Sequence, residues 1–145
     1  MGATLLLPDA MTLPHVVARG HAILIEDGSI RKIIDGGDQP ETATRLEGIL
    51  MPGFLDLQVN GSGGRGVHEL DVDALETVAR SVWQGGAVAF LPTLITAPFD
   101  QLLAQLRAVA TWIRTRAADR HPDTATPLGV HVEGPFLEVA GAHDP

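Results

Sequence analysis

From residue 54 onward, short apolar segments alternate with longer segments of helical periodicity. Residues 54–59, 87–91 and 128–132 are predicted to be strands, because each is short, mainly apolar and bounded by glycine or proline. Between them, residues 71–84 and residues from 98 to about 120 repeat apolar side chains at helical spacing. The order strand, helix, strand, helix, strand predicts parallel strands joined by right-handed crossovers.

The first 50 residues predict a different organisation, built from short strands alone. The dipeptide Asp27-Gly28 separates two apolar runs and is typical of a hairpin turn, because both residue types tolerate a positive φ. Three or four short strands form a thin structure, so we expect this region to need a covering partner. The candidate strands are residues 3–7, 21–25, 29–34 and 46–50.

The charge and composition of the 145 residues exclude several classes of function. A formal net charge of −8 argues against nucleic acid or an anionic membrane as the main partner. Since the chain has no cysteine, a metal would have to bind His, Asp, Glu or water. No apolar run reaches the roughly 20 residues of a membrane span, and the N-terminus lacks a signal-peptide pattern, so we expect a cytoplasmic protein.

Polar side chains interrupt two of the predicted parallel strands near their carboxyl ends. Gln58 and Asn60 are two residues apart, as are His131 and Glu133, so each pair leaves its strand on one face. The carboxyl ends of parallel strands are where α/β enzymes place metal ligands and acid/base groups. A His–Glu hydrogen-bonded pair in a turn is the alternative. The glycine-rich run at residues 61–64 is either a phosphate cradle or a plain turn, and it lacks a phosphate-binding spacing.

Three motifs point to a known family. After a small β-domain, residues 52–61 (Pro-Gly-Phe-Leu-Asp-Leu-Gln-Val-Asn-Gly) resemble the amidohydrolase superfamily. Together with residues 90–96 and 131–137, they closely resemble the N-acetylglucosamine-6-phosphate deacetylase family. The resemblance implies an α/β fold, with a small β-sandwich part in residues 1–50. Residues 51–145 would then form a partial (β/α) TIM-type barrel of about three strands, the N-terminal part of such an enzyme.

The resemblance also implies an activity and a set of site residues. The reaction is hydrolysis of the acetamide of N-acetylglucosamine 6-phosphate to glucosamine 6-phosphate and acetate, by a carbon–nitrogen hydrolase that is a cytoplasmic homodimer when full length. Glu133 corresponds to a metal ligand, and Ala142 and His143 correspond to substrate-binding residues. The family often has a lysine just before the glycine of this last segment, where this chain has Val139 and Ala140.

Gln58 and Asn60 bear on the number of metal ions. Many amidohydrolases have His-x-His at this point, whereas this chain has Gln58-Val59-Asn60, and neutral amides are poor ligands for a transition metal. We therefore expect one divalent metal ion, zinc, with Gln58 and Asn60 holding water or substrate. His131 either orients Glu133 or water from a second shell, or simply packs.

The resemblance places the general base, an aspartate, and two histidine ligands beyond residue 145. No residue of this chain is therefore predicted to be the general base, and we expect the chain to be inactive alone. Two alternatives stay open. One is another amidohydrolase, dihydroorotase-like or dipeptidase-like, which Gln58 and Asn60 argue against. The other is a non-catalytic truncated module for binding or assembly.

Overall fold

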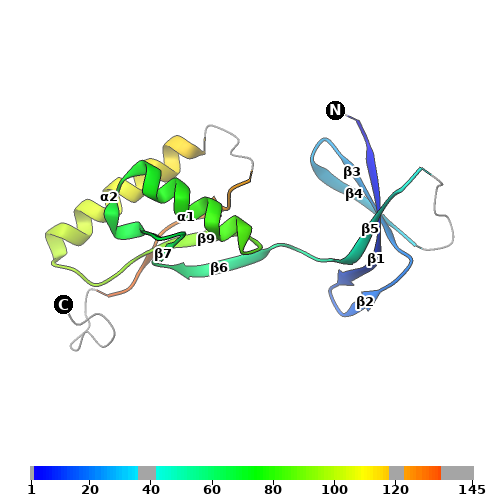
Figure 1. Ribbon diagram of the computed structural model, residues 1–145, viewed down its shortest axis with the longest axis horizontal. Helices are drawn as coiled ribbons and strands as arrows, with labels where there is room; N and C mark the ends of the chain where they lie inside the picture. Colours follow the sequence, from blue (N-terminus) through cyan, green and yellow to red (C-terminus); the bar gives the residue numbers. More distant parts are fainter. Residues whose placement is uncertain (1, 36–41, 118–122, 135–145) are drawn as a thin grey trace. The chain divides into compact units, whose positions relative to one another are not determined.

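The computed structural model describes residues 2–35, 42–117 and 123–134 of a mixed α/β chain (Figure 1). The chain divides into two compact units, Met1–Pro52 and Gly53–Pro145. The first contains strands only, and the second combines strands with helices. In the described part of the chain, no helix has both the length and the apolarity to cross a membrane.

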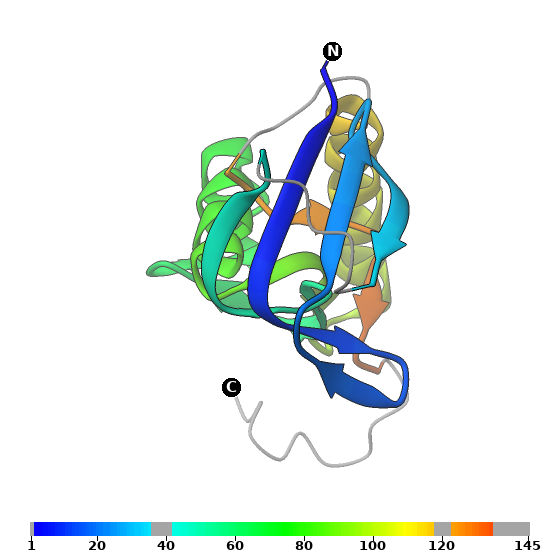
Figure 2. The ribbon, with the colours of Figure 1, turned by 90° about the vertical axis from the view of Figure 1, so that its right-hand side faces the viewer.

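The first unit is a five-stranded sheet built around a long first strand (Figure 2). Strand β1 pairs antiparallel with β2 and β3, and parallel with β5, while β4 pairs antiparallel with β3. The predicted hairpin is confirmed, since Asp27 and Gly28 have φ values of 50° and 74° between β3 and β4. The strands are β1 (Thr4–Leu13), β2 (Val16–Ala18), β3 (Ala22–Glu26), β4 (Ser29–Ile34) and β5 (Thr44–Leu50).

Strand β1 is longer than predicted because it continues through a proline. Proline donates no backbone hydrogen bond and is tolerated in a sheet at edges and irregularities. The pairing of β1 with β5 shifts register between Pro8 and Ala10, which accommodates Pro8 without ending the strand. The continuation of β1 then forms a hairpin with β2 that the sequence did not predict.

The second unit contains parallel strands, as the alternation of segments predicted. Strand β9 is central, and β6, β10 and β11 all pair with it in parallel. The strand predicted at residues 128–132 is divided, with β10 earlier and β11 at its end. The elements are β6 (Phe54–Val59), β7 (Gly61–Ser62), β8 (Arg65–Gly66), η1 (Val67–Glu69), α1 (Val72–Gln84), β9 (Ala87–Leu94), α2 (Phe99–Arg116), β10 (Thr126–Pro127) and β11 (His131–Val132).

Helices α1 and α2 lie on one face of the β6–β9 sheet and form the core with it (Figure 1). Helix α1 begins after Asp71, whose carboxylate accepts a hydrogen bond from the Asp73 amide at 3.3 Å, as expected of an N-cap. Its apolar stripe packs against Phe90 of β9 and Trp112 of α2. The buried residues of α1 are Ala74, Leu75, Val78, Ala79 and Val82.

Strand β6 departs from the prediction that it would be buried. Phe54, Leu55 and Leu57 are 58%, 58% and 63% exposed, whereas Val59 is 5% exposed. The reason is that β6 pairs only with β9 among the described residues, so its other edge lacks a neighbouring strand there. Its apolar composition is nevertheless that of a strand covered on both faces.

Candidate functional site

Three of the predicted site residues converge where the parallel strands end. The Gln58 side-chain amide donates to Glu133 Oε2 at 3.4 Å, and the Asn60 amide approaches the same oxygen at 3.5 Å. Glu133 follows β11, whereas the two amides come from β6 and the residue after it, so β9 lies between the two contributors. The fold thus brings together residues more than 70 positions apart in the chain.

A local irregularity in β6 sets the direction of its polar side chains. The register of β6 against β9 shifts between Asp56 and Val59, opposite Pro92, which has no N–H to donate. In this irregular stretch, the Gln58 backbone amide donates to the Asp56 carboxylate at 3.2 Å, and the Val59 backbone amide donates to the Thr93 hydroxyl at 3.0 Å. Such bulges redirect side chains and are frequent beside functional sites.

Two backbone contacts fix Glu133 against the end of β9. Its N–H donates to the Leu94 carbonyl at 2.8 Å, and its carbonyl accepts a hydrogen bond from the Thr96 hydroxyl at 2.7 Å. The next residue, Gly134, has a φ of +107°, and a Cβ there would collide with the Thr96 hydroxyl. Glycine is therefore required immediately after Glu133, for both its conformation and its size.

The remaining predicted residues have different outcomes. His131 lies opposite Thr93 in the pairing of β11 with β9. Its Nδ1 atom is buried and, in the described part of the chain, has no hydrogen-bond partner, so the structure leaves both of its predicted roles open. Ala142 and His143 lie outside the described residues, and their assignment to substrate stays a prediction.

The glycine-rich run after Asn60 forms a hairpin. Strands β7 and β8 pair around Gly63 and Gly64, whose φ values are 64° and 78°. The Val67 amide donates to the Asn60 carbonyl at 2.8 Å, which closes the base of the hairpin directly on a site residue. This geometry agrees with the plain turn rather than with a phosphate cradle.

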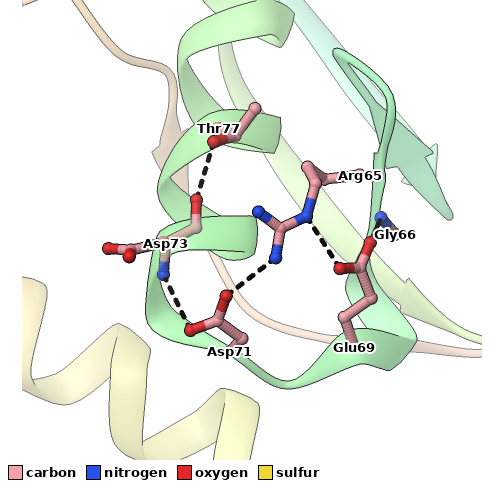
Figure 3. Close-up of polar contacts among 6 residues, drawn as sticks. All are labelled: Arg65, Gly66, Glu69, Asp71, Asp73 and Thr77. Atoms are coloured by element: carbon pink, nitrogen blue, oxygen red, sulfur yellow. Dashed lines mark hydrogen bonds and ion pairs between the residues drawn. The ribbon is translucent and has the colours of Figure 1, made fainter.

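A cluster of charges anchors this hairpin to the start of α1 (Figure 3). Arg65 donates to Glu69 Oε2 and to Asp71 Oδ2, both at 2.7 Å, and the Gly66 amide donates to Glu69 Oε1 at 2.6 Å. The Gly66 amide and then Arg65 lower the pKa of Glu69, and Arg65 is the main cause of the lowered pKa of Asp71. Sequence reasoning missed this cluster, although the four-residue spacing of Arg65 and Glu69 suits an ion pair.

The cluster of Gln58, Asn60 and Glu133 supplies one carboxylate, not a complete metal site. In residues 2–35, 42–117 and 123–134, no group of three or more His, Cys, Asp or Glu side chains is placed to hold a metal ion. Gln58 and Asn60 also line a hollow of about 360 Å³ beside β6. Its other polar lining residues include Asp56, Ser62 and Ser81.

Comparison with known proteins gives a consistent result, although no family model matches the chain. The chain is 32% identical over 138 residues to the N-acetylglucosamine-6-phosphate deacetylase of Haemophilus influenzae, covering 89% of this chain and 34% of that protein. It is 38% identical over 103 residues to an N-acetylgalactosamine-6-phosphate deacetylase of a Shewanella species, covering 68% of this chain and 24% of that protein.

A solved structure of a protein with the same name has a similar fold. The crystal structure of N-acetylglucosamine-6-phosphate deacetylase from Pasteurella multocida superposes with a TM-score of 0.78 at 28% identity, covering 99% of this chain and 38% of that one. The chain therefore spans between 24% and 38% of the length of these three relatives.

Proposed function

Since this chain is related to the N-terminal part of N-acetylglucosamine-6-phosphate deacetylases, we propose that it belongs to an enzyme that removes the acetyl group from an amino-sugar phosphate. The reaction is metal-dependent hydrolysis of the acetamide of N-acetylglucosamine 6-phosphate to glucosamine 6-phosphate and acetate. The observation that carries this proposal is the meeting of Gln58, Asn60 and Glu133 at the carboxyl ends of parallel strands. That end is the active end of a parallel α/β sheet.

Glu133 is the ligand that this chain contributes to the metal. Its carboxylate is a suitable donor for zinc, and the Gln58 and Asn60 amides steady it through Oε2. A catalytic zinc takes about three protein ligands, so the remaining ligands come from residues outside the described part of the chain. A metal held there would supply Lewis acidity, which would lower the pKa of a water molecule and polarise the amide carbonyl.

The same amides favour one metal ion over two. A second transition metal would need imidazole or carboxylate donors where Gln58 and Asn60 stand, and amides bind such metals weakly. In the proposed enzyme, these two side chains donate hydrogen bonds to Glu133 and to water or substrate. The general base is an aspartate outside this chain, which accepts a proton from water and returns one to the leaving amine.

The proposal extends to the architecture of the whole enzyme. The exposed apolar strand β6 is covered when the three parallel strands are completed to a (β/α) barrel. Residues 1–50 then belong to a β-sandwich, and the enzyme is a cytoplasmic homodimer. Because the Shewanella relative is named for the galactosamine epimer, the configuration at one sugar carbon is the part of the substrate that most needs testing.

Acetate release by the complete protein that carries this chain tests the proposed function. We expect turnover of N-acetylglucosamine 6-phosphate that stops after treatment with a chelator and returns when zinc is added. N-acetylgalactosamine 6-phosphate, dihydroorotate and a β-aspartyl dipeptide are assayed in parallel. Preference for dihydroorotate or the dipeptide would favour a different amidohydrolase, and the absence of turnover on all four would favour a non-catalytic module.

The 145-residue chain alone provides a second test. It contributes one ligand, so we expect neither turnover nor tight zinc binding from it. Turnover by the isolated chain comparable to that of the complete protein would contradict the assignment of the other ligands and the general base to residues outside it.

A further inference from the structure

Two threonines near the end of β9 contact the neighbours of that strand on opposite sides. Thr93 is 2% exposed, and its hydroxyl accepts the Val59 amide at 3.0 Å while donating to the Leu91 carbonyl at 3.1 Å. On the β6 side, the Thr93 hydroxyl thus gives the Val59 amide an acceptor where the register of β6 against β9 is irregular. The amide that it binds lies between Gln58 and Asn60 in the chain.

Thr96 has the corresponding position on the β11 side. Its hydroxyl donates to the Glu133 carbonyl at 2.7 Å, directly beside the Leu94 contact made by the Glu133 amide. Gly134 gives the hydroxyl the room that it needs, since any Cβ at that position would collide with it. These two contacts hold the backbone of Glu133 at one place relative to β9.

We propose that Thr93 and Thr96 are positioning residues that fix the Gln58–Asn60 segment and Glu133 in register across β9. The two hydroxyls set the separation of the two halves of the site, although neither threonine touches the substrate or the metal. This proposal rests on the proposed function in one respect, namely that Glu133 is a metal ligand. Second-sphere partners of metal ligands typically change affinity or activity by roughly 10- to 100-fold when they are removed.

Threonine-to-valine substitutions in the complete protein isolate the two hydroxyls, because valine has nearly the same shape. Thr96→Val is the main variant, since Thr96 is only half-buried and its loss endangers folding less than that of Thr93. Thr96→Ser restores the hydroxyl. Thr115→Val is the matched control, because Thr115 is an exposed threonine on α2 whose hydroxyl also donates to a backbone carbonyl, that of Thr111 at 3.0 Å.

Two measurements are made on each variant, and neither depends on turnover. The first is zinc affinity by competition with a chromogenic chelator. We expect Thr96→Val to weaken it by roughly 10- to 100-fold, with Thr96→Ser and Thr115→Val close to the unmodified protein. The second is hydrogen exchange of the backbone, which we expect to rise at residues 131–134 in Thr96→Val and at residues 57–60 in Thr93→Val.

The outcomes separate this proposal from the proposed function. If the unmodified protein binds no zinc, the metal-dependent function fails, and the exchange rates alone decide whether the hydroxyls hold the strand ends. If the unmodified protein binds zinc and Thr96→Val binds it equally tightly with unchanged exchange, the positioning role is refuted. A lower denaturation midpoint in Thr96→Val with unchanged zinc affinity would likewise refute it, since it would leave a structural role only.

Discussion

Two glutamates of the second unit receive hydrogen bonds in the same pattern but in contrasting surroundings. Glu133 Oε2 is approached by two neutral side-chain amides at 3.4 and 3.5 Å. Glu76 Oε1 on α1 is bonded at 2.9 Å by both Trp112 Nε1 and Arg116 Nε of α2. Each carboxylate joins elements that are distant in the sequence. The contacts of Glu76 are short and one of them carries a full charge, whereas these contacts of Glu133 are long and neutral.

The difference indicates that Glu76 serves stability, and the neutral contacts of Glu133 agree with the role that we propose for it. The Arg116 side chain is 6% exposed, and its guanidinium also donates to the Ala125 carbonyl at 3.1 Å and to the Thr124 hydroxyl. It lies over the Trp112 ring as well, 5.5 Å from its centroid. Glu76 thus completes a tight network between α1, α2 and the segment before β10. The two amides on Glu133 are neutral donors that orient its carboxylate, as outer hydrogen bonds do for metal ligands.

The largest expected effect is that of Glu133→Gln on metal binding. Since we propose that Glu133 is a direct ligand, its replacement should weaken zinc affinity by more than about 100-fold, beyond the range expected for hydrogen-bond partners of ligands, and abolish most turnover. The thermal midpoint of the metal-free protein should change little. Glu47→Gln is the matched control, because Glu47 is exposed on β5. Chelator competition and calorimetry measure the two quantities, and unchanged zinc affinity in Glu133→Gln would remove the distinction between the two glutamates.

The reciprocal variant is Glu76→Gln, for which stability should fall and zinc affinity should hold. Removing one partner of a buried ion pair costs about 3–5 kcal/mol, and because the Glu76 side chain is 27% exposed we expect the lower part of that range. Chemical denaturation followed by circular dichroism gives the free energy of unfolding. A clear loss of zinc affinity in Glu76→Gln would show that the two networks are not separate.

Trp112→Phe removes the neutral hydrogen bond of the same network. It should lower the free energy of unfolding less than Glu76→Gln does. The indole N–H to Glu76 is lost while most of the apolar packing stays, so we expect a loss of about 1–2 kcal/mol in unfolding free energy. Combining Trp112→Phe with Glu76→Gln should give less than the sum of the single losses, because the two side chains share one hydrogen bond. Strict additivity in a double-mutant cycle would contradict that shared contact.

The sequence predicted the parts of the fold that depend on local periodicity and on chain direction. Parallel strands end at one edge of a sheet, so Gln58, Asn60 and Glu133 could be expected to meet once their segments were recognised as strands. The hairpin at Asp27-Gly28 followed from the φ preferences of two residues. In both cases, a few residues determine the local structure, and the details of side-chain packing are not needed to predict it.

The features that the sequence did not predict depend on register and on packing between distant elements. Thr93 and Thr96 are ordinary threonines until the pairing of β9 places their hydroxyls opposite particular backbone groups. Gln105 and Arg116 lie on the buried face of α2, where helical periodicity predicts apolar side chains. Arg116 is buried because Glu76 and residues 124–125 receive its hydrogen bonds, which no spacing rule reveals.

Glu69 and Asp71, which pair with Arg65, are carboxylates in contact with water. Substitution in this cluster should change the stability of the protein least among the variants considered. The pKa values of Glu69 and Asp71 lie below their ordinary values of 4.5 and 3.8 in the folded chain. Stabilisation by these groups is therefore complete above about pH 5 and is lost as the pH falls through the lowered folded pKa values.

Arg65→Met should reduce this acid sensitivity without abolishing it. Asp71 loses the main cause of its lowered pKa, whereas Glu69 keeps the Gly66 amide, which is its largest cause. We expect the denaturation midpoint of the variant to fall less steeply than that of the unmodified protein between about pH 5 and pH 3. Arg114→Met, which removes an exposed arginine of α2, should keep the original slope. Identical slopes in Arg65→Met and the unmodified protein would mean that exposure to water cancels these contacts, unlike the contacts of the buried network around Glu76.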